Sequence, residues 1–456
     1  MAAAGRRATL VVVSSTTTFP RPLFLLRGGN RPDDAVAFIT ALRDRFEAGA
    51  GESGKARPLL VPIGPGEDAE AVKSDLARRL DPHGPAIDPE VDLLLRTSGS
   101  TTGTGALVAM SMRALTASAR ATHARLGGPG SWVLALPAQH VAGLQVVVRS
   151  LLAGRAPVVA DTSRGFTPDA LADAITRALA TRPGDPVRVS LVPTQLVRAL
   201  AAGQEQARAA LARVDAVLLG GAGADLALLE RARAAGVRVV TTYGMSETGG
   251  GCVYDGVPLD GVEVRIENPD GDGVGRVVVA GPVLAHGYAE RGAGRAPSAG
   301  AAVFRERSDP AARRDLLTSD IGKLIDGTDG VRRLAVLGRV DDVIITGGIK
   351  VVPREVEQVL TALGGVAEAC VVGVPDAQWG HTVVAVVVPE STAKPGDRRV
   401  WAEQLRAAAR QRLDGAHAPK RIVVVDALPL RGPGKVDRLA VARLADEAGA
   451  LAQDSA

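Results

Sequence analysis

Short apolar runs alternate with longer helical segments between about residue 90 and residue 250. The apolar runs are Val91–Arg96, Trp132–Leu136, Pro157–Ala160, Val187–Val192, Ala216–Leu219 and Val237–Thr241. The segments of helical length lie near Arg113–Arg125, Leu144–Leu152, residues 194–202 and residues 225–235. Repeated βαβ units of this kind form a parallel sheet with helices on both faces. The pattern therefore predicts an α/β fold whose ligands bind in loops beyond the carboxyl ends of the strands.

The pattern changes twice in the second half of the chain. After Cys252, short strands such as Gly261–Ile266 and Gly275–Ala280 are separated by Gly/Asp turns, which predicts a small β-subdomain. Arg291–Ala302 lacks this pattern and is expected to be disordered. A third unit begins near Gly338, with helices at Arg354–Leu363 and Arg399–Leu413 and strands at Ala369–Val374, Val383–Val388 and Ile422–Val425.

The chain of 456 residues is too long for one ordinary core, so these changes are interpreted as domain boundaries. Residues 1–338 are predicted to form a large N-terminal domain with parallel βαβ sheets and the small β-subdomain. Residues 339–456 are predicted to form a small α+β C-terminal domain. At the two ends, Ala8–Val13 is expected to be a first strand and the last ten residues a frayed tail.

Composition narrows the class of protein. Charged residues make up 23% of the chain, and the net charge of +4 comes from scattered basic residues. Aromatic residues are only 3%, so the basic, aromatic-lined face of a nucleic-acid-binding protein is missing. No apolar segment approaches the roughly 18 residues of a membrane span, and Cys252 and Cys370 match no disulfide or zinc spacing. We expect a cytoplasmic protein with an anionic small-molecule substrate, no nucleic-acid partner and no membrane span, and composition leaves a homodimer open.

The first motif that indicates chemistry is the Gly/Ser/Thr-rich stretch Thr97–Gly105, which follows a predicted strand and precedes a predicted helix. Glycines allow backbone N–H groups to approach phosphate oxygens, and hydroxyl groups add further donors. A flexible surface loop is the alternative, because such stretches are common.

The second motif is Thr242–Gly249, which follows the predicted strand Val237–Thr241. Within it, Tyr243, Ser246 and Glu247 could hold a purine, a phosphate and Mg²⁺ respectively. The alternative is an ordinary helix N-terminus with an acidic residue in its first turn.

The third motif is Thr318–Gly322, followed after a short hairpin by Gly338–Asp342. Asp320 could accept hydrogen bonds from ribose hydroxyl groups, and Arg339 could donate to them. In isolation, a pair of ordinary turns is the better explanation of these residues.

The fourth motif is Leu430–Lys435, a Gly/Pro turn that presents Lys435 near the C-terminus. A lysine on such a turn is a mobile point charge that can meet developing negative charge. The usual explanation of a turn lysine is solvation alone.

Together and in this order, the four motifs resemble the adenylate-forming superfamily of acyl-CoA synthetases, luciferases and peptide-synthetase adenylation domains. The resemblance runs from about residue 90 to residue 440. Further matches are Leu219–Ala222, which resembles the adenine-site loop, Gly347–Lys350 with Glu355–Glu357, and Gly373–Asp376 with Trp379 and Gly380. The resemblance implies an ATP-dependent, two-step reaction. A carboxylate first attacks the α-phosphorus of ATP, and the coenzyme A (CoA) thiol then attacks the resulting acyl-adenylate.

The resemblance also implies a role for each matching residue. The ATP phosphates would be bound by Thr97, Ser98, Gly99, Ser100 and Thr101, and the adenine by Gly220, Gly221, Ala222, Tyr243 and Gly244. Ser246 would contact the α-phosphate, Glu247 would bind Mg²⁺, and Asp320 and Arg339 would bind ribose. Lys435 would bridge the carboxylate and the α-phosphate during adenylation. Asp341 would be the hinge of a mobile C-terminal domain, and the Gly347–Gly348 turn would face the site during the CoA step.

One departure from the family concerns the phosphate loop, which normally continues into a Pro-Lys-Gly segment. Here the matching stretch is Thr104–Leu107, and no lysine occurs between Lys73 and Lys323. Either another cation substitutes, with Arg96 and Arg113 nearest in sequence, or amide and hydroxyl groups bind the phosphates alone.

Two segments resemble the o-succinylbenzoate–CoA ligases of menaquinone biosynthesis. They are Leu136–Gly154, which contains His140 and Arg149, and Leu191–Leu196, which contains Thr194 and Gln195. o-Succinylbenzoate keeps a second carboxylate and a ketone, and these four side chains could supply donors to them. A buried structural histidine and a surface arginine are alternatives. The rival functions are a ligase for another aryl or short-chain acid and a non-catalytic protein that binds acyl-adenylates.

Overall fold

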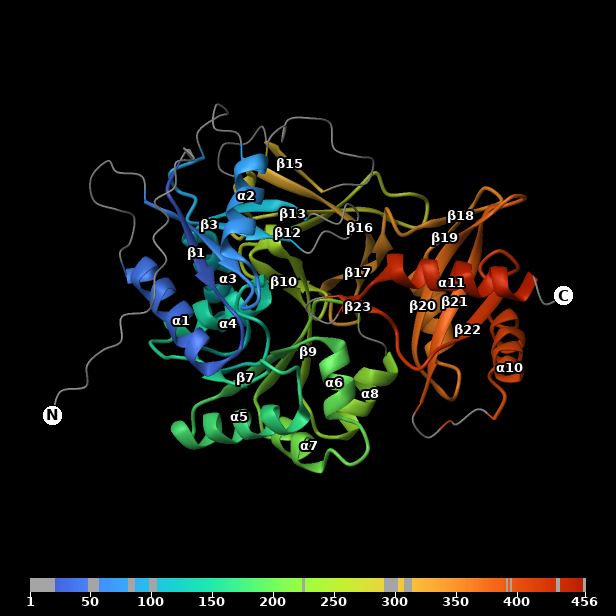
Figure 1. The fold of residues 1–456 in the computed structure, drawn as a ribbon, viewed down its shortest axis with the longest axis horizontal. Helices are drawn as coiled ribbons and strands as arrows, with labels where there is room; N and C mark the ends of the chain where they lie inside the picture. Colours follow the sequence, from blue (N-terminus) through green and yellow to red (C-terminus); the bar gives the residue numbers. More distant parts are fainter. Residues whose placement is uncertain are drawn as a thin grey trace.

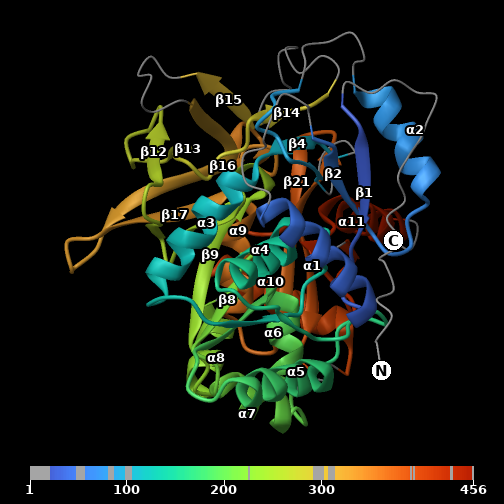
Figure 2. The same ribbon diagram turned by 90° about the vertical axis from the view of Figure 1, so that its left-hand side faces the viewer.

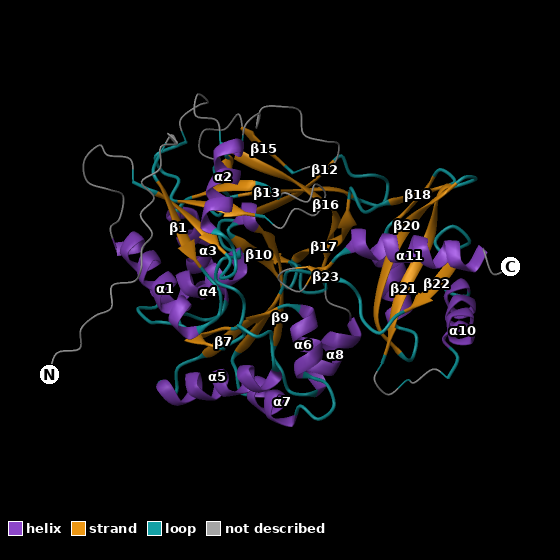
Figure 3. Cartoon of the chain, viewed as in Figure 1, coloured by secondary structure: helices purple, strands orange, loops and turns teal. Residues whose placement is uncertain are grey.

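The computed structural model describes residues 21–47, 57–80, 87–97, 105–223, 226–290, 302–306, 314–390, 393, 396–431 and 435–453. Their helices and strands form a large N-terminal part and a smaller C-terminal part, which lie side by side (Figure 1). The N-terminal part contains two parallel or mixed sheets and an antiparallel sheet, and the C-terminal part contains a fourth sheet (Figure 3). The predicted fold class is confirmed.

The first sheet has the order β1-β2-β3-β4-β14. Its strands are β1 (Leu23–Arg27), β2 (Leu59–Ile63), β3 (Leu93–Arg96), β4 (Leu107–Met110) and β14 (Gly287–Tyr288). β1, β2 and β3 are parallel, whereas β3 and β4 form an antiparallel hairpin. The helices α1 (Pro32–Glu47) and α2 (Ala69–Arg79) connect its first strands. We did not predict these elements before residue 80, although their strands are almost wholly apolar.

The second sheet has the order β11-β10-β9-β8-β7-β5-β6, and β9 through β6 are parallel. Its strands are β5 (Ser131–Leu134), β6 (Val158–Val159), β7 (Val187–Leu191), β8 (Ala216–Leu219), β9 (Val239–Met245), β10 (Gly250–Tyr254) and β11 (Val257–Pro258). Each predicted strand of this sheet forms, with ends that differ from the prediction by at most four residues, and β8 matches it at both ends. β9 continues beyond Thr241 to Met245, so the second motif begins inside a strand.

Helices cover both faces of the second sheet, as predicted. α3 (Met112–Arg125) and α4 (Val141–Leu152) share a core with α1 and with strands of both parallel-containing sheets (Figure 2). α5 (Pro168–Thr181), α7 (Glu205–Ala212) and α8 (Leu226–Ala234) pack on the opposite face, beside α6 (Pro193–Ala199). The hydroxyl group of Thr167 caps α5 by accepting from the N–H of Ala170. We did not predict α7.

The antiparallel β-subdomain has the order β12-β13-β16-β15, with β17 paired to β16. Its strands are β12 (Glu263–Glu267), β13 (Gly275–Ala280), β15 (Val303–Glu306), β16 (Arg314–Asp326) and β17 (Arg332–Arg339). The short helix η1 (Ser246–Thr248) lies between β9 and β10. The predicted strand Ala8–Val13 and residues 291–301 lie outside the described residues.

The C-terminal sheet contains β18 (Ile344–Thr346), β19 (Ile349–Val351), β20 (Val366–Asp376), β21 (Gly380–Pro389) and β22 (Arg421–Val424). α9 (Pro353–Thr361) and α10 (Arg398–Arg410) pack on one face, and α11 (Arg438–Gln453) packs on the other. The predicted frayed tail is wrong up to Gln453, because α11 continues to that residue and buries Gly449 against the side chain of Arg421. The short hairpin of β23 (Leu430–Arg431) and β24 (Lys435–Val436) precedes α11. The exact boundary at residue 338 stays a prediction.

Among the described residues, no helix is both long and apolar enough to cross a lipid bilayer.

Candidate active site

The phosphate-loop motif lies in the β3–β4 hairpin. Its first residue, Thr97, donates its backbone N–H to the carbonyl of Ala106 at 2.9 Å. The N–H of Ala106 donates in turn to Oγ1 of Thr97 at 2.7 Å. The two described ends of the hairpin are therefore joined at its base. Ser98, Gly99, Ser100 and Thr101 lie outside the described residues, so their contacts with ATP stay predictions.

The predicted adenine-site residues lie at the carboxyl ends of β8 and β9, the edge where α/β sheets bind ligands. Gly220 follows β8, and a Cβ atom there would lie 2.3 Å from Oγ1 of Thr242. A Cβ atom on Gly244 would lie 2.1 Å from the carbonyl oxygen of Gly250. Only glycine permits these approaches. Gly221 and Ala222 follow and are exposed, so a ligand can reach this loop.

The predicted adenine and ribose residues contact one another. The hydroxyl group of Tyr243 donates to Oδ2 of Asp320 at 2.7 Å. Arg339 lies opposite Asp320 in the β16–β17 register and donates to both carboxylate oxygens of Asp341, at 2.8 and 2.9 Å. Burial raises the pKa of the Asp320 carboxyl, while the Tyr243 hydrogen bond and the charge of Arg339 oppose that shift. The structure thus brings the predicted ribose pair, the adenine tyrosine and the predicted hinge into one chain of contacts.

The predicted metal-binding carboxylate, Glu247, lies in η1 and is 8% exposed. The hydroxyl group of Tyr288 on β14 donates to its Oε1 atom at 2.8 Å. Burial raises the pKa of Glu247, and this hydrogen bond opposes the shift. Ser246, the preceding residue, is half-buried and accepts at its carbonyl from the N–H of Gly249 at 3.1 Å. One oxygen of Glu247 is therefore oriented by a tyrosine that the sequence analysis missed.

Lys435 belongs to the C-terminal part but reaches the N-terminal sheet. A Cβ atom built on Gly221 would lie 3.7 Å from Cε of Lys435. Burial lowers the pKa of His140, and the positive charge of Lys435 lowers it further. Lys435 is therefore close to the adenine-site loop and within electrostatic range of the N-terminus of α4. The predicted catalytic lysine therefore lies near members of both the predicted adenine and the predicted substrate residues.

Three of the four predicted substrate residues lie at the carboxyl edge of the second sheet. His140 is the N-cap residue of α4 and makes no side-chain capping bond. Thr194 and Gln195 lie in the first turn of α6. Gln195 accepts at Oε1 from the N–H of Val192 at 3.1 Å and donates from Nε2 to the carbonyl of Ala135 at 3.2 Å. Gln195 therefore also joins the ends of β5 and β7.

Arg149 lies apart from these residues, in the last turn of α4, and is 3% exposed. Its Nη2 donates to the hydroxyl group of Tyr254 at 3.2 Å, and its guanidinium lies 5.1 Å from the centre of the Trp132 ring. Within the described residues it has no acidic partner, and its Nε atom is buried without an acceptor. The structure shows no contact between Arg149 and His140, so its substrate role stays a prediction.

The predicted CoA-step turn lies between β18 and β19. Gly347 and Gly348 both have positive φ, at 55° and 83°, which explains the two glycines. The N–H of Gly347 donates to the carbonyl of Trp379 at 2.9 Å. Trp379, Ile345 and Ile349 around this turn are about half exposed. This turn and Lys435 lie in different hairpins of the C-terminal part.

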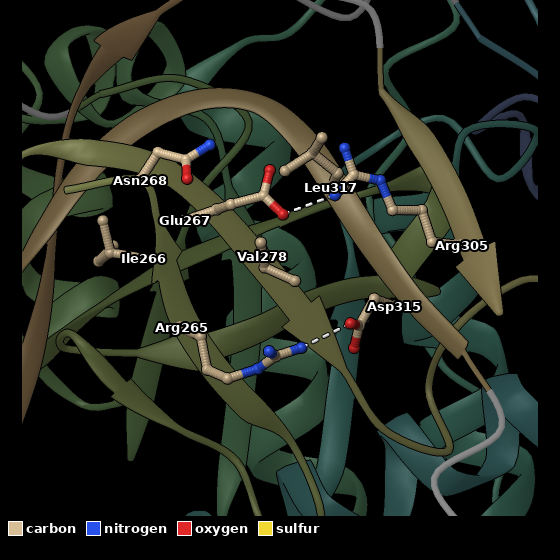
Figure 4. Close-up of a pocket in the computed structure, with 8 residues that line it drawn as sticks. All are labelled: Arg265, Ile266, Glu267, Asn268, Val278, Arg305, Asp315 and Leu317. Atoms are coloured by element: carbon tan, nitrogen blue, oxygen red, sulfur yellow. Dashed lines mark hydrogen bonds and ion pairs between the residues drawn. The ribbon is translucent and has the colours of Figure 1, made fainter. Parts of the chain in front are cut away.

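A separate pocket of about 260 Å³ lies on the β-subdomain and contains none of the predicted site residues. Figure 4 shows its two ion pairs, Arg265 with Asp315 at 2.6 Å and Arg305 with Glu267 at 2.5 Å. Each charge in this pocket that could bind an ionic ligand is thus already paired. The pocket is therefore not the centre at which the motifs meet.

Tyr288 and Glu67 are the residues near the site that sequence reasoning missed. Glu67 follows β2 and forms an ion pair with Arg96. Each lies outside the four motifs, and its partner comes from a distant segment. The sequence offered one signal that could have identified Tyr288, because the chain contains only three tyrosines. Each of the three forms a hydrogen bond with a predicted site residue.

The family profile of AMP-binding enzymes matches residues 35–289. The chain belongs to the AMP-binding enzyme family. The profile of the AMP-binding enzyme C-terminal domain also matches residues 355–435, which end at Lys435. The recognition of an adenylate-forming enzyme is thereby confirmed.

Several members of this AMP-binding enzyme family are similar over most of the chain. A probable 2-succinylbenzoate–CoA ligase of Mycobacterium tuberculosis is 45% identical over 79% of this chain and 86% of its own length. A feruloyl-CoA synthase of Amycolatopsis sp is 31% identical over 83% of this chain and 73% of that protein. Among solved structures, the o-succinylbenzoate CoA synthetase of Bacillus subtilis in complex with its acyl-adenylate intermediate is 26% identical, with a TM-score of 0.64 over 91% of this chain and 87% of the other.

Proposed function

We propose that this AMP-binding enzyme is an ATP-dependent o-succinylbenzoate–CoA ligase that acts in menaquinone biosynthesis. The observation that carries the proposal is the 45% identity to a probable 2-succinylbenzoate–CoA ligase across 79% of the chain. The position of Lys435 beside Gly221 supports a catalytic protein, because a protein that only binds acyl-adenylates needs no lysine at the reacting centre. Two free, buried cysteines fit a reducing cytoplasm, which also supplies ATP and CoA.

In the first step, an oxygen of the substrate carboxylate attacks the α-phosphorus of ATP. The bond from that phosphorus to the bridging oxygen breaks, and pyrophosphate leaves with the electron pair. Lys435 would stabilise the negative charge shared by the carboxylate and the α-phosphate, while Asp320 and Arg339 hold the ribose. Positioning and charge stabilisation supply most of the catalysis in such a transfer.

Glu247 fits the role of a Mg²⁺ ligand. It is a buried carboxylate that accepts a hydrogen bond from Tyr288, and it has no hydrogen-bonded or ion-paired cation among the described residues. No group of three or more metal-binding side chains occurs among those residues. Mg²⁺ commonly binds through one or two carboxylates together with phosphates and water, so one carboxylate suffices. When bound, the ion would offset charge on the phosphates of ATP.

In the second step, the sulfur of CoA attacks the acyl carbon, AMP leaves, and the thiol proton passes to solvent. The Gly347–Gly348 turn would face the site in this step, after the C-terminal domain rotates about Asp341. Its positive φ angles keep side chains off the turn, and the exposed Trp379 beside it offers an apolar surface. The two steps would thus use different faces of the same domain.

The choice of acid depends on the second carboxylate of o-succinylbenzoate. His140 and Thr194 lie at the ligand edge, and Arg149 is a buried cation without an acidic partner in the described part of the chain. Arg149 lies apart from these two residues, in the last turn of α4, but a carboxylate that reached it would relieve the cost of this buried charge. A site built to pair a carboxylate strongly rejects acids that lack it, because its donors stay unpaired.

A panel assay tests the proposal. CoA-dependent release of AMP is measured with o-succinylbenzoate, benzoate, ferulate and a medium-chain fatty acid. We expect kcat/KM for o-succinylbenzoate to exceed that for each monocarboxylic acid by at least about a hundredfold. Arg149→Ala should lower kcat/KM for o-succinylbenzoate and leave the KM for ATP unchanged. Equal use of ferulate, the acid named by the second relative, would instead support an aryl-acid ligase.

A further inference from the structure

The predicted phosphate loop, Thr97–Gly105, contains no lysine or arginine, and no lysine lies between Lys73 and Lys323. Anionic phosphates are normally bound with at least one positive side chain in addition to backbone N–H groups. In the part of the chain that the structure describes, three arginines lie near the ends of the hairpin that carries the loop: Arg79, Arg96 and Arg113.

Two of these arginines are poorly placed to bind the phosphates. Arg113 is 60% exposed and pairs at 2.8 Å with Glu90. Arg79 pairs with both Asp75 and Glu290 and donates to the carbonyl of Gly105. Two carboxylates already surround Arg79, so its role is to anchor the end of the hairpin. Arg113 is excluded by its position, because it follows Met110, which pairs with Leu93 at the end of the hairpin away from the loop. Arg79 is excluded by its two carboxylate partners.

Arg96 differs in position and in its partners. It is the last residue of β3 and directly precedes Thr97, at the carboxyl edge where ligands bind. Its Nη2 atom pairs with Glu67, which also accepts from the N–H of Gly64. Its Nε atom is buried and has no hydrogen-bond partner among the described residues. The side chain is 23% exposed, so it is oriented by one acid and still reachable.

Arg96 also lies near His140, one of the predicted substrate residues. Burial and the charge of Lys435 lower the pKa of His140, Arg96 lowers it further, and Glu67 raises it. His140 therefore lies within electrostatic range of both the Arg96–Glu67 pair and Lys435. The pair and the lysine approach His140 from different domains of the chain.

We infer that Arg96 replaces the missing lysine of the phosphate loop and binds the triphosphate of ATP, with Glu67 holding its guanidinium until the nucleotide arrives. This inference rests on the proposed function, because it assigns one binding residue within the same site. ATP takes over part of the hydrogen bonding that Glu67 provides in the free protein. Glu67 and ATP thus compete for Arg96. A purely structural ion pair would show no such competition.

The test measures the equilibrium Kd of ATP for the full chain by calorimetry, with no acid present, together with the Tm of each variant. Arg96→Ala should raise the Kd about tenfold to a hundredfold, the range of a hydrogen bond to a charged group. Arg96→Lys should restore part of the affinity. Glu67→Gln, which keeps an acceptor for Gly64, should lower the Kd by up to about fivefold, because a partly exposed ion pair is removed. Arg113→Ala is the matched control and should bind ATP like the unaltered protein.

The inference is supported if Arg96→Ala raises the Kd of ATP and Glu67→Gln lowers it. Breaking a purely structural ion pair would raise the Kd of ATP whichever partner is changed. An unchanged Kd in Arg96→Ala, a higher Kd in Glu67→Gln, or a rise only in the KM for the acid would overturn it. Failure of the proposed function has a different signature. In that case the unaltered protein ligates no o-succinylbenzoate, while its ATP affinity still depends on Arg96.

Discussion

The hydroxyl group of Tyr243 donates a 2.7 Å hydrogen bond to the carboxylate of Asp320. Tyr243 lies on β9 of the parallel sheet and Asp320 on β16 of the β-subdomain, so the bond joins two different sheets. From the sequence, Tyr243 was predicted to bind adenine and Asp320 to bind ribose. In the structure the tyrosine ring and the carboxylate form one unit, and a change in one side chain affects the other.

Tyr243→Phe should therefore weaken ATP binding even though the aromatic ring stays. The lost hydrogen bond leaves Asp320 less well oriented, and a hydrogen bond to a charged group is worth about 1.5–3 kcal/mol. We expect the Kd of ATP to rise about tenfold or more, measured by titration calorimetry. Tyr254→Phe is the matched control, because its hydroxyl group contacts Thr122 and Arg149 instead. Equal ATP affinity in both variants would contradict the coupling.

Lys435→Ala should slow adenylate formation by about a hundredfold to a thousandfold, the usual effect of removing one charge-stabilising donor. The same variant should convert preformed acyl-adenylate and CoA to thioester at nearly the normal rate. The reason is that Lys435 and the Gly347–Gly348 turn lie in different hairpins. Single-turnover assays of each half-reaction provide the measurement, and Lys420→Ala, an exposed lysine, is the control. Equal losses in both half-reactions would refute a two-face mechanism.

Asp341→Pro should slow the thioester step more than the adenylation step. Proline restricts φ to about −65° and removes a backbone donor, which should hold the hinge in the arrangement with Lys435 near Gly221. Asp341→Ala loses the same bonds with Arg339 but leaves the backbone free, so it separates the two effects. Rates of the two half-reactions are compared across both variants. Normal rates for both steps in Asp341→Pro would show that the pivot lies elsewhere.

His123 should make the protein sensitive to mild acid. Burial and the charges of Arg149, Arg188 and Arg155 lower its pKa from 6.5 to about 4. A histidine with a depressed pKa contributes stability above pH 6.5 that is lost as the pH falls toward 4, since the unfolded chain binds the proton more readily. At pH 5 the loss should be roughly 2 kcal/mol in the free energy of unfolding.

Urea unfolding of His123→Leu and of the unaltered protein at pH 7 and pH 5 measures this effect. The variant should lose less stability between the two pH values, whatever its stability at pH 7. His381→Leu is the control, because His381 is exposed on β21. A drop in His123→Leu as large as in the unaltered protein would show that other groups cause the acid sensitivity.

The sequence predicted the fold class, the strands of the central sheet and the family, but parts of the fold escaped it. The frayed tail was wrong because α11, held against the sheet by Val441 and Ala445, continues to Gln453, and this packing depends on strands distant in sequence. β1 and β2 were missed because each is an apolar run of only five residues, and β2 contains Pro62, which argues against a strand. Assignments on Ser98–Thr101 stay predictions, since these residues lie outside the described part of the chain.

The sequence by itself determined which chemical groups are present and in what order. Buried parallel strands require apolar runs, and close backbone approaches require glycine, as at Gly220 and Gly244, so both leave local signals. Only the tertiary structure decided which groups meet: Lys435 with Gly221, Tyr288 with Glu247, and Arg96 with Glu67. Each pair joins elements of different sheets or of separate strands, and the packing of those elements sets the distances. The spacing of these residues along the chain does not reveal those distances.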